Sequence, residues 1–209
     1  MRWEAQSGEE KPALALPLEQ VRSQTQPEII ALGEEFRIDQ YDTALPELDR
    51  VCAGFIVRAF EKLGFQLLPE RRFSTGEAQE AMKIAPRFRR LLERMLQILA
   101  EDGVLERADT DWVVRRTPDY PDPVESAQDL LARYPDLEGE LKMTLRCAQS
   151  LDGVLREQVD PLQLLFPGGS LEDSEKLYQE SPSARFYNTL LARAISTLVA
   201  DLPPGRKLR

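Results

Sequence analysis

Carboxylates are the side chains in this sequence whose types and spacing come closest to a reactive site. Three close-set acidic groups occur at Glu34/Glu35, Glu138/Glu140 and Glu172/Asp173/Glu175. Paired carboxylates can act as general acid and base, or can bind a metal ion. Each group falls on an expected helix surface or helix N-terminus, where negative charge complements the helix dipole. We therefore expect these acids to stabilise helices, and we assign no metal site.

Histidine does not occur in the chain, and this excludes several kinds of site. There can be no imidazole base, no Ser/His/Asp or Cys/His triad, and no histidine metal ligand. The two cysteines, Cys52 and Cys147, are far apart, and each lies in an apolar helical pattern. We expect buried free thiols rather than a disulfide. Any catalysis within this chain would rest on Asp, Glu, Lys, Tyr or Cys.

An arginine cluster raises the possibility of nucleic-acid binding. Its members are Arg87, Arg89, Arg90, Arg94, Arg115 and Arg116. Acidic residues interleave with them, including Glu93, Glu101 and Glu106, and the net charge of −9 opposes binding to a phosphate backbone. The pattern favours a solvated, salt-bridged face over a DNA-binding surface.

The first elements that would position these groups are three helices and a hairpin, predicted for residues 41–117. The first helix, over 43–63, can be capped by Asp42 or Thr43 and closed by Gly64. The second follows the capping-box pair Ser74 and Glu77, and the third runs from Pro86 to Gly103. Strand-like runs at 104–108 and 112–116 then form a hairpin. This order is that of a winged-helix module.

Shorter helices are predicted beyond a proline-punctuated hinge at 117–123. One helix starts at Asp122-Pro123 and another at Asp136, and short turns are expected at 151–158 and 161–165, the second of them capped by Asp160. Tight-turn residues at 166–169 precede a helix capped by Ser170, and Ser181-Pro182 opens the last helix. Residues 1–40 are interpreted as a linker or tail with a short helix over 28–36. The fold class is therefore mainly α: a winged-helix-like module followed by a subdomain of short helices.

Two helices show the clearest apolar faces. On the third helix of the module the face comprises Phe88, Leu91, Leu92, Met95, Leu96, Ile98 and Leu99; on the last helix it comprises Phe186, Tyr187, Leu190, Leu191, Ala194, Ile195, Leu198 and Val199. We expect both faces to be core, so that Leu91→Ala or Leu191→Ala costs about 2–5 kcal/mol of folding free energy.

Composition indicates an ordinary soluble domain. The 209 residues are 42% hydrophobic and 30% charged. No apolar run approaches the roughly 20 residues of a membrane span, and the start has no signal-peptide pattern. We expect a cytoplasmic protein without a Gly-rich phosphate loop.

Several phrases of the sequence, in this order, resemble the S-adenosylmethionine-dependent methyltransferase domains of modular polyketide synthases. They are ELDRVCAGFIVRAFEKLGF, the block IAPRFRRLLERMLQILAEDGVLERADTDWVV, and the final stretch from QVDPLQLLFPGG to LPPGRKLR. The resemblance covers residues 43–209. It implies that 118–209 form a helical lid leading into a Rossmann-like core, which would begin near Leu208 and which this chain lacks.

This resemblance also implies partners and candidate site residues. The complete domain would bind S-adenosylmethionine and methylate, on carbon or oxygen, an acyl chain carried on an acyl carrier protein. Neighbouring synthase domains and a homodimer through the parent synthase are further expected partners. Candidate cofactor-binding residues are Tyr178, Phe186, Tyr187 and Asn188; candidate substrate-cavity residues are Phe166, Gly168 and Gly169.

Alternative interpretations remain at this stage. Phe186 and Tyr187 could simply belong to the core face, and residues 166–169 could be a plain turn. The whole chain could instead be a winged-helix interaction or DNA-binding module, or a non-catalytic structural linker of a polyketide synthase. Under the favoured interpretation no catalytic residue lies here, and we expect the chain alone to be inactive and to bind the cofactor weakly or not at all.

Overall fold

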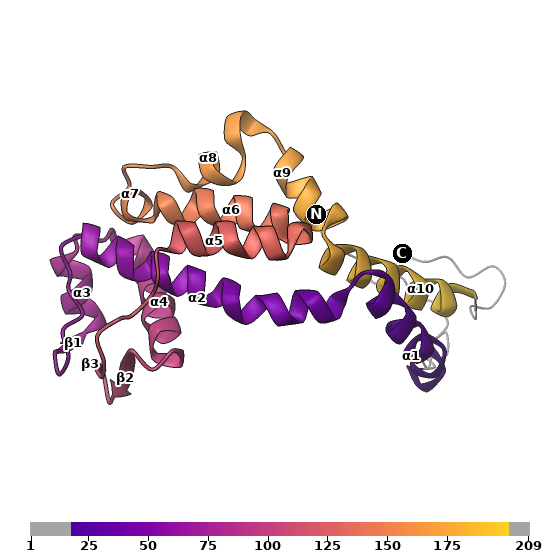
Figure 1. Ribbon diagram of the computed structural model, residues 1–209, viewed down its shortest axis with the longest axis horizontal. Coiled ribbons are helices and arrows are strands. Elements are labelled where there is room, and N and C mark those ends of the chain that lie inside the picture. The colour runs from indigo at the N-terminus through magenta and orange to yellow at the C-terminus, as the bar shows by residue number, and fades with distance from the viewer. Residues whose placement is uncertain (1–17, 201–209) are drawn as a thin grey trace, which may run out of the picture.

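One long helix, α2 (Ile38–Lys62), runs through the middle of the molecule (Figure 1). The structure is a computed structural model and describes residues 18–200. The helix follows Arg37, which has a left-handed φ of 52°, and ends before Gly64, whose φ is 81°. The closing glycine was predicted correctly, but the predicted start was wrong. Thr43 lies inside the helix, where its hydroxyl donates to the Asp39 carbonyl at 2.7 Å.

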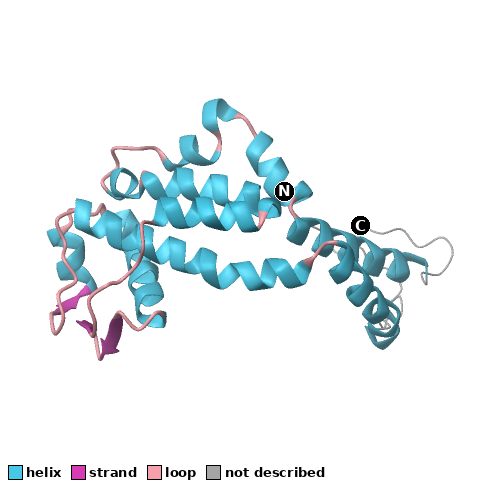
Figure 2. Cartoon of the chain, viewed as in Figure 1, coloured by secondary structure: helices cyan, strands magenta, loops and turns pink. Residues whose placement is uncertain are grey.

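The C-terminal half of α2 belongs to a module that contains the strands of the described region (Figure 2). Its other elements are β1 (Arg72–Ser74), α3 (Thr75–Ala81), η1 (Pro86–Phe88), α4 (Arg89–Glu101), β2 (Leu105–Ala108) and β3 (Asp111–Val114). The predicted hairpin is confirmed as β2 and β3. A third strand, β1, was not predicted; it pairs antiparallel with β3, so the sheet order is β1-β3-β2.

The residues predicted to begin and end the helices of this module do so in the structure. The Ser74 hydroxyl accepts from the backbone N–H of Glu77, and the Glu77 carboxylate accepts from the backbone N–H of Ser74 at 2.7 Å, which completes the capping box. Gly103, with a φ of 72°, follows α4. These signals act within a few residues, so the sequence alone predicts them well.

The core of the module lies between α2, α4 and the sheet. Phe60, Leu96 and Trp112 are each almost fully buried in it. The predicted face of α4 is correct for Leu92, Met95, Leu96 and Leu99 but wrong for Leu91, which is 40% exposed. At 100° per residue, Leu91 lies at the edge of the buried stripe that Leu92, Met95, Leu96 and Leu99 form, and it is therefore only partly covered.

Along the middle of α2 lie α5 (Pro123–Arg133) and α6 (Glu138–Gln149), with the turn η2 (Pro135–Leu137) between them. Val51 and Phe55 of α2 meet Leu130 and Leu141 there in a second core. The predicted cap of α5 is confirmed, because the Asp122 carboxylate accepts from the backbone N–H of Val124 and of Glu125. The helix predicted to start at Asp136 instead begins as η2, and α6 follows.

Four short helical pieces and a turn follow α6 and lie over it in Figure 1. They are α7 (Leu151–Leu155), α8 (Pro161–Leu165), η3 (Pro167–Gly169), α9 (Glu172–Glu175) and the π-helical η4 (Lys176–Glu180). Asp160 caps α8 by accepting from the backbone N–H of Leu162, as predicted. Gly168 and Gly169 have φ values of 61° and 79°, which confirms the predicted tight turn.

A pair of helices, α1 (Leu18–Glu35) and α10 (Pro182–Ala200), packs together at the end of the molecule away from the sheet (Figure 1). Leu32, Phe36 and Phe186 form the small core between them. The helix α1 is much longer than the short one predicted for 28–36. Residues 1–17 of the predicted tail, and the strand start predicted near Leu208, lie outside the described residues.

The predicted core face of α10 is largely wrong. Phe186 is 6% exposed, but Leu191 is 59% exposed, and Tyr187, Ile195 and Val199 are exposed as well. None of the helices described between 18 and 200 is both long and apolar enough to cross a membrane.

Candidate functional site

The candidate cofactor residues gather where η4 turns into α10. Ser181, at this turn, is 7% exposed; its hydroxyl donates to the Leu177 carbonyl at 2.8 Å and accepts from the backbone N–H of Ala184 at 3.3 Å. The Asn188 side-chain amide donates to the Tyr178 carbonyl at 3.0 Å. These three bonds fix η4 against the first turns of α10, and the bond to the Tyr178 carbonyl occupies one donor of Asn188.

The four residues of this group have different surroundings. Tyr178 and Tyr187 are 70% and 63% exposed, whereas Phe186 is buried against α1. The Phe186 and Tyr187 rings meet edge to face, with centroids 5.0 Å apart. The alternative interpretation, that these two residues belong to the core, is therefore correct for Phe186 and wrong for Tyr187. The residues are brought together, but as an open surface and not around an enclosed cavity.

The candidate substrate-cavity residues lie elsewhere. Phe166 follows α8, which packs on α6, and Gly168 and Gly169 form the exposed turn η3. This part of the chain is at the top of Figure 1, apart from α10. Within the described residues the two predicted groups therefore do not form one site.

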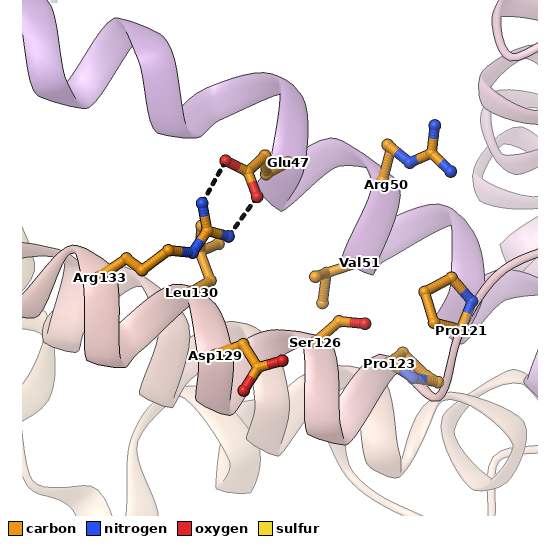
Figure 3. A pocket seen from close by; sticks show the side chains of 9 residues that line it. All are labelled: Glu47, Arg50, Val51, Pro121, Pro123, Ser126, Asp129, Leu130 and Arg133. Carbon is orange, nitrogen blue, oxygen red and sulfur yellow. Dashed lines mark hydrogen bonds and ion pairs between the residues drawn. The ribbon is translucent and has the colours of Figure 1, made fainter.

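A pocket between α2 and α5 was not predicted from the sequence (Figure 3). Its volume is about 180 Å³, below the range of about 300–1,000 Å³ that is typical of small-molecule sites. The Arg133 guanidinium binds the Glu47 carboxylate with two hydrogen bonds across the pocket, and this pairing lowers the pKa of Glu47. The two residues are 86 positions apart in sequence, so no local signal could reveal the pair. We interpret it as a link between two helices.

Three of the seven acidic residues considered for catalysis are engaged in ion pairs. Glu138 pairs with Lys142 at 2.7 Å, and Glu172 pairs with Lys176 at 2.9 Å. Asp173 accepts from the Arg146 guanidinium at 2.7 Å. Glu34 and Glu35 are exposed at the end of α1. None of these arrangements places two free carboxylates around a reactive centre.

Glu140 is different, because it turns into the protein. Both of its carboxylate oxygens are buried and lack a hydrogen-bond partner. Burial raises the pKa of Glu140. Its own backbone N–H and the nearby Ser181 hydroxyl act in the opposite direction, but their effect is smaller. That hydroxyl donates to the Leu177 carbonyl instead. The residue is therefore poorly solvated as a carboxylate, which a sequence pattern cannot show.

Arginines of the supposed nucleic-acid surface are paired, as the interleaved acids predicted. Arg94 binds Glu101 and Arg115 binds Glu106, each at 2.6 Å, and Arg87 binds Glu157 at 2.8 Å. Arg116 donates to the Asp102 carbonyl. A DNA backbone would have to displace these partners, so the surface does not favour nucleic-acid binding.

The thiols and acids also offer little for a metal ion. Cys52 and Cys147 are both free, as predicted, though only half-buried, and burial raises the pKa of each thiol. Among residues 18–200, no three Cys, Asp or Glu side chains are grouped so as to hold a metal ion. Among the described residues, the site thus consists of packing surfaces and the exposed Tyr178 and Tyr187, without a cluster of reactive side chains.

The relatives found by comparison with known proteins include several non-reducing polyketide synthases. No family model matches the chain. It is 30% identical over 183 residues to the non-reducing polyketide synthase pigA of Monascus ruber, a match that covers 83% of this chain and 7% of that protein. It is 32% identical over 136 residues to the non-reducing polyketide synthase azaA of Aspergillus niger, covering 64% of this chain and 5% of that protein.

Solved structures agree with these relatives. The CurJ carbon methyltransferase matches with a TM-score of 0.82 and 33% identity, over 91% of this chain and 50% of that one. The carbon methyltransferase domain of the citrinin polyketide synthase matches in fold, with a TM-score of 0.74 and 19% identity, over 90% of this chain and 49% of that one. The chain therefore spans about half of the solved domains and a small fraction of the synthases.

Proposed function

We propose that this chain is the lid and scaffold half of a polyketide synthase carbon methyltransferase domain. The premise is that the chain is homologous to non-reducing polyketide synthases and has the fold of half of such a domain. One observation carries the proposal: the match to the CurJ carbon methyltransferase covers nearly the whole of this chain but only 50% of that structure. The other half would contain the reacting centre.

The cofactor of the proposed reaction is S-adenosylmethionine, which supplies the methyl group from its sulfonium when bound. We do not expect the described residues to hold this molecule by themselves, because Tyr178 and Tyr187 lie on an open surface and Phe186 is packed against α1. We place the cofactor mainly in the other half of the domain. Tyr178, Tyr187 and Asn188 remain our candidates for contacting it from this side.

What this chain contributes to the reaction is enclosure. Methyl transfer needs a nucleophile and a methyl group held in line and shielded from water. The firm packing of α5 and α6 on α2 gives a scaffold, and the short pieces α7–α9 with the turn at Gly168 and Gly169 provide a cover that can adjust to an acyl chain. Phe166 and these glycines remain the candidate cavity residues, and the substrate is an acyl chain on an acyl carrier protein. The relatives favour methylation at carbon over oxygen.

The proposed subdivision places a winged-helix-like module at 41–117 and the lid at 118–209. The order α2, β1, α3, α4, β2, β3 and the sheet order β1-β3-β2 support a winged-helix arrangement. The paired arginines argue that this module packs or spaces other domains and does not read DNA. A DNA column at moderate salt tests this point, since retention of the chain would favour the alternative function.

A chimera tests the lid function directly. Residues 18–200 would replace the matching half of the CurJ carbon methyltransferase, and transfer of a methyl group from S-adenosylmethionine to an acyl thioester would be followed by mass spectrometry. We expect methyl transfer by the chimera and none by either half alone. A folded chimera that binds S-adenosylmethionine but leaves every acyl thioester unmodified would instead support the structural-linker function.

A further inference from the structure

The helix α10 has apolar side chains on two different faces. One face packs on α1 through Phe186 and Leu190. On a second face, about 100° around the helix from the first, Tyr187, Leu191, Ile195 and Val199 follow one another at four-residue steps and are 63%, 59%, 49% and 43% exposed. Ala194 and Leu198 lie between them on the same side and are half-buried. We call these six residues the α10 band.

Charge is missing from the α10 band. Arg193 is the sole ionisable side chain besides Tyr187 between positions 187 and 199, and it points the other way, toward Glu28 of α1, with an ion pair of 3.4 Å. A solvent-facing helix surface normally carries polar and charged residues, and a helix that is apolar all round is normally buried. Contiguous exposed apolar surface of this kind marks an interaction site.

Resting on the lid function above, we propose that the α10 band is the surface on which the other half of the methyltransferase domain docks. The match covers 50% of the CurJ chain, so the unmatched part of that chain is about as long as the matched part. In that structure, a second half of similar length therefore accompanies this fold. The occupant should present an uncharged apolar face, because the band offers no ion-pair partner. A second copy of this chain is the competing occupant.

Hydrogen exchange in the chimera tests the docking independently of activity. Amide protons of residues 187–199 should exchange at least about tenfold more slowly in the chimera than in the 209-residue chain alone, because docking suppresses local opening of α10. Equal exchange in the two proteins, with methyl transfer intact, would overturn the docking while leaving the lid function standing. Protection without methyl transfer would support the docking and count against the lid function.

A matched pair of substitutions locates the contact. Leu191→Asp changes the α10 band, and Leu68→Asp changes a leucine of similar exposure, 56%, in the module at the far end of the molecule. Leu191→Asp should lower the melting temperature of the chimera by about 2 °C or more and leave that of the isolated chain unchanged. Leu68→Asp should leave both unchanged. Light scattering that shows a dimer of the isolated chain, dissociated by Leu191→Asp alone, would assign the band to a second copy and overturn the proposal.

Discussion

Glu140 shows how much a single buried side chain can set the pH response of this fold. Its two oxygens are buried without partners, and its pKa is raised by burial. A carboxyl whose folded-state pKa is raised contributes its full stability only below the unfolded value, and this contribution is lost as the pH rises through the folded-state pKa. Above its folded-state pKa, Glu140 is therefore an ionised group that the folded protein solvates poorly.

We expect Glu140→Gln to raise the free energy of unfolding at pH 7 relative to the wild type, because it removes the buried charge. The advantage should shrink as the pH falls toward the ordinary glutamate pKa, where the wild-type carboxyl is protonated. Urea unfolding at several pH values measures this difference, and Glu138→Gln, on the exposed neighbour paired with Lys142, is the control. An advantage independent of pH would show that Glu140 is not the titrating group.

A buried hydrogen bond fixes the sheet to α3. The Trp112 indole N–H donates to the Thr75 hydroxyl at 3.0 Å, and these residues are 1% and 6% exposed. Thr75→Val keeps the shape but leaves the indole without an acceptor, so we expect a loss of about 1–3 kcal/mol in folding free energy. Thr117→Val, at an exposed loop position, should change it little. Denaturant melts of both variants decide the matter; equal stabilities would contradict the assigned role of this bond.

Among the helices, α4 gives the sharpest test of which face is core. Leu99 is fully buried and Leu91 is 40% exposed. We expect Leu99→Ala to cost about 2–5 kcal/mol, as buried leucine truncations do, and Leu91→Ala to cost about 0.5 kcal/mol or less. Thermal or urea unfolding of the two variants checks this. A larger loss at Leu91 than at Leu99 would mean that α4 is rotated about its axis.

Element by element, the sequence predicts what local chemistry decides. The capping box at Ser74, the caps Asp122 and Asp160, and the hairpin around Asp109 depend on residues a few positions apart, and they are confirmed. Apolar spacing also located α10, but it could not distinguish the face that packs on α1 from the face that is left exposed, since both are apolar. Leu191 was assigned to the wrong side for this reason.

Interactions between distant segments could not be predicted from the sequence. The strand β1 has only three residues and is defined by its pairing with β3, in which Arg72 lies opposite Val113 and Ser74 opposite Asp111. The link from Glu47 to Arg133, and the burial of Glu140, likewise depend on how helices pack. The candidate site was predicted in part: Tyr178 and Asn188 do meet, but nothing in the sequence showed that they would lie on an open surface.

At the scale of the whole molecule, α2 joins parts that the sequence appeared to separate. Its residues enter both the core of the β-sheet module and the core beneath α5 and α6. The segment 117–123, predicted as a hinge, is held to α2 and to the end of α4: the Tyr120 hydroxyl donates to Asp102 at 2.6 Å, and Arg58 pairs with Asp122 at 3.3 Å. The module and the helices α5 and α6 therefore share α2 as one scaffold, which argues against two freely moving domains.

The central claim is that this chain covers a reacting centre that belongs to other polypeptide. Isothermal titration of the 209-residue chain with S-adenosylmethionine, beside the chimera that restores the other half of the domain, tests it most directly. We predict no measurable heat of binding at micromolar concentrations for the chain alone and saturable binding for the chimera. Micromolar binding by the isolated chain would contradict the account, because the cofactor site would then lie among the residues described here.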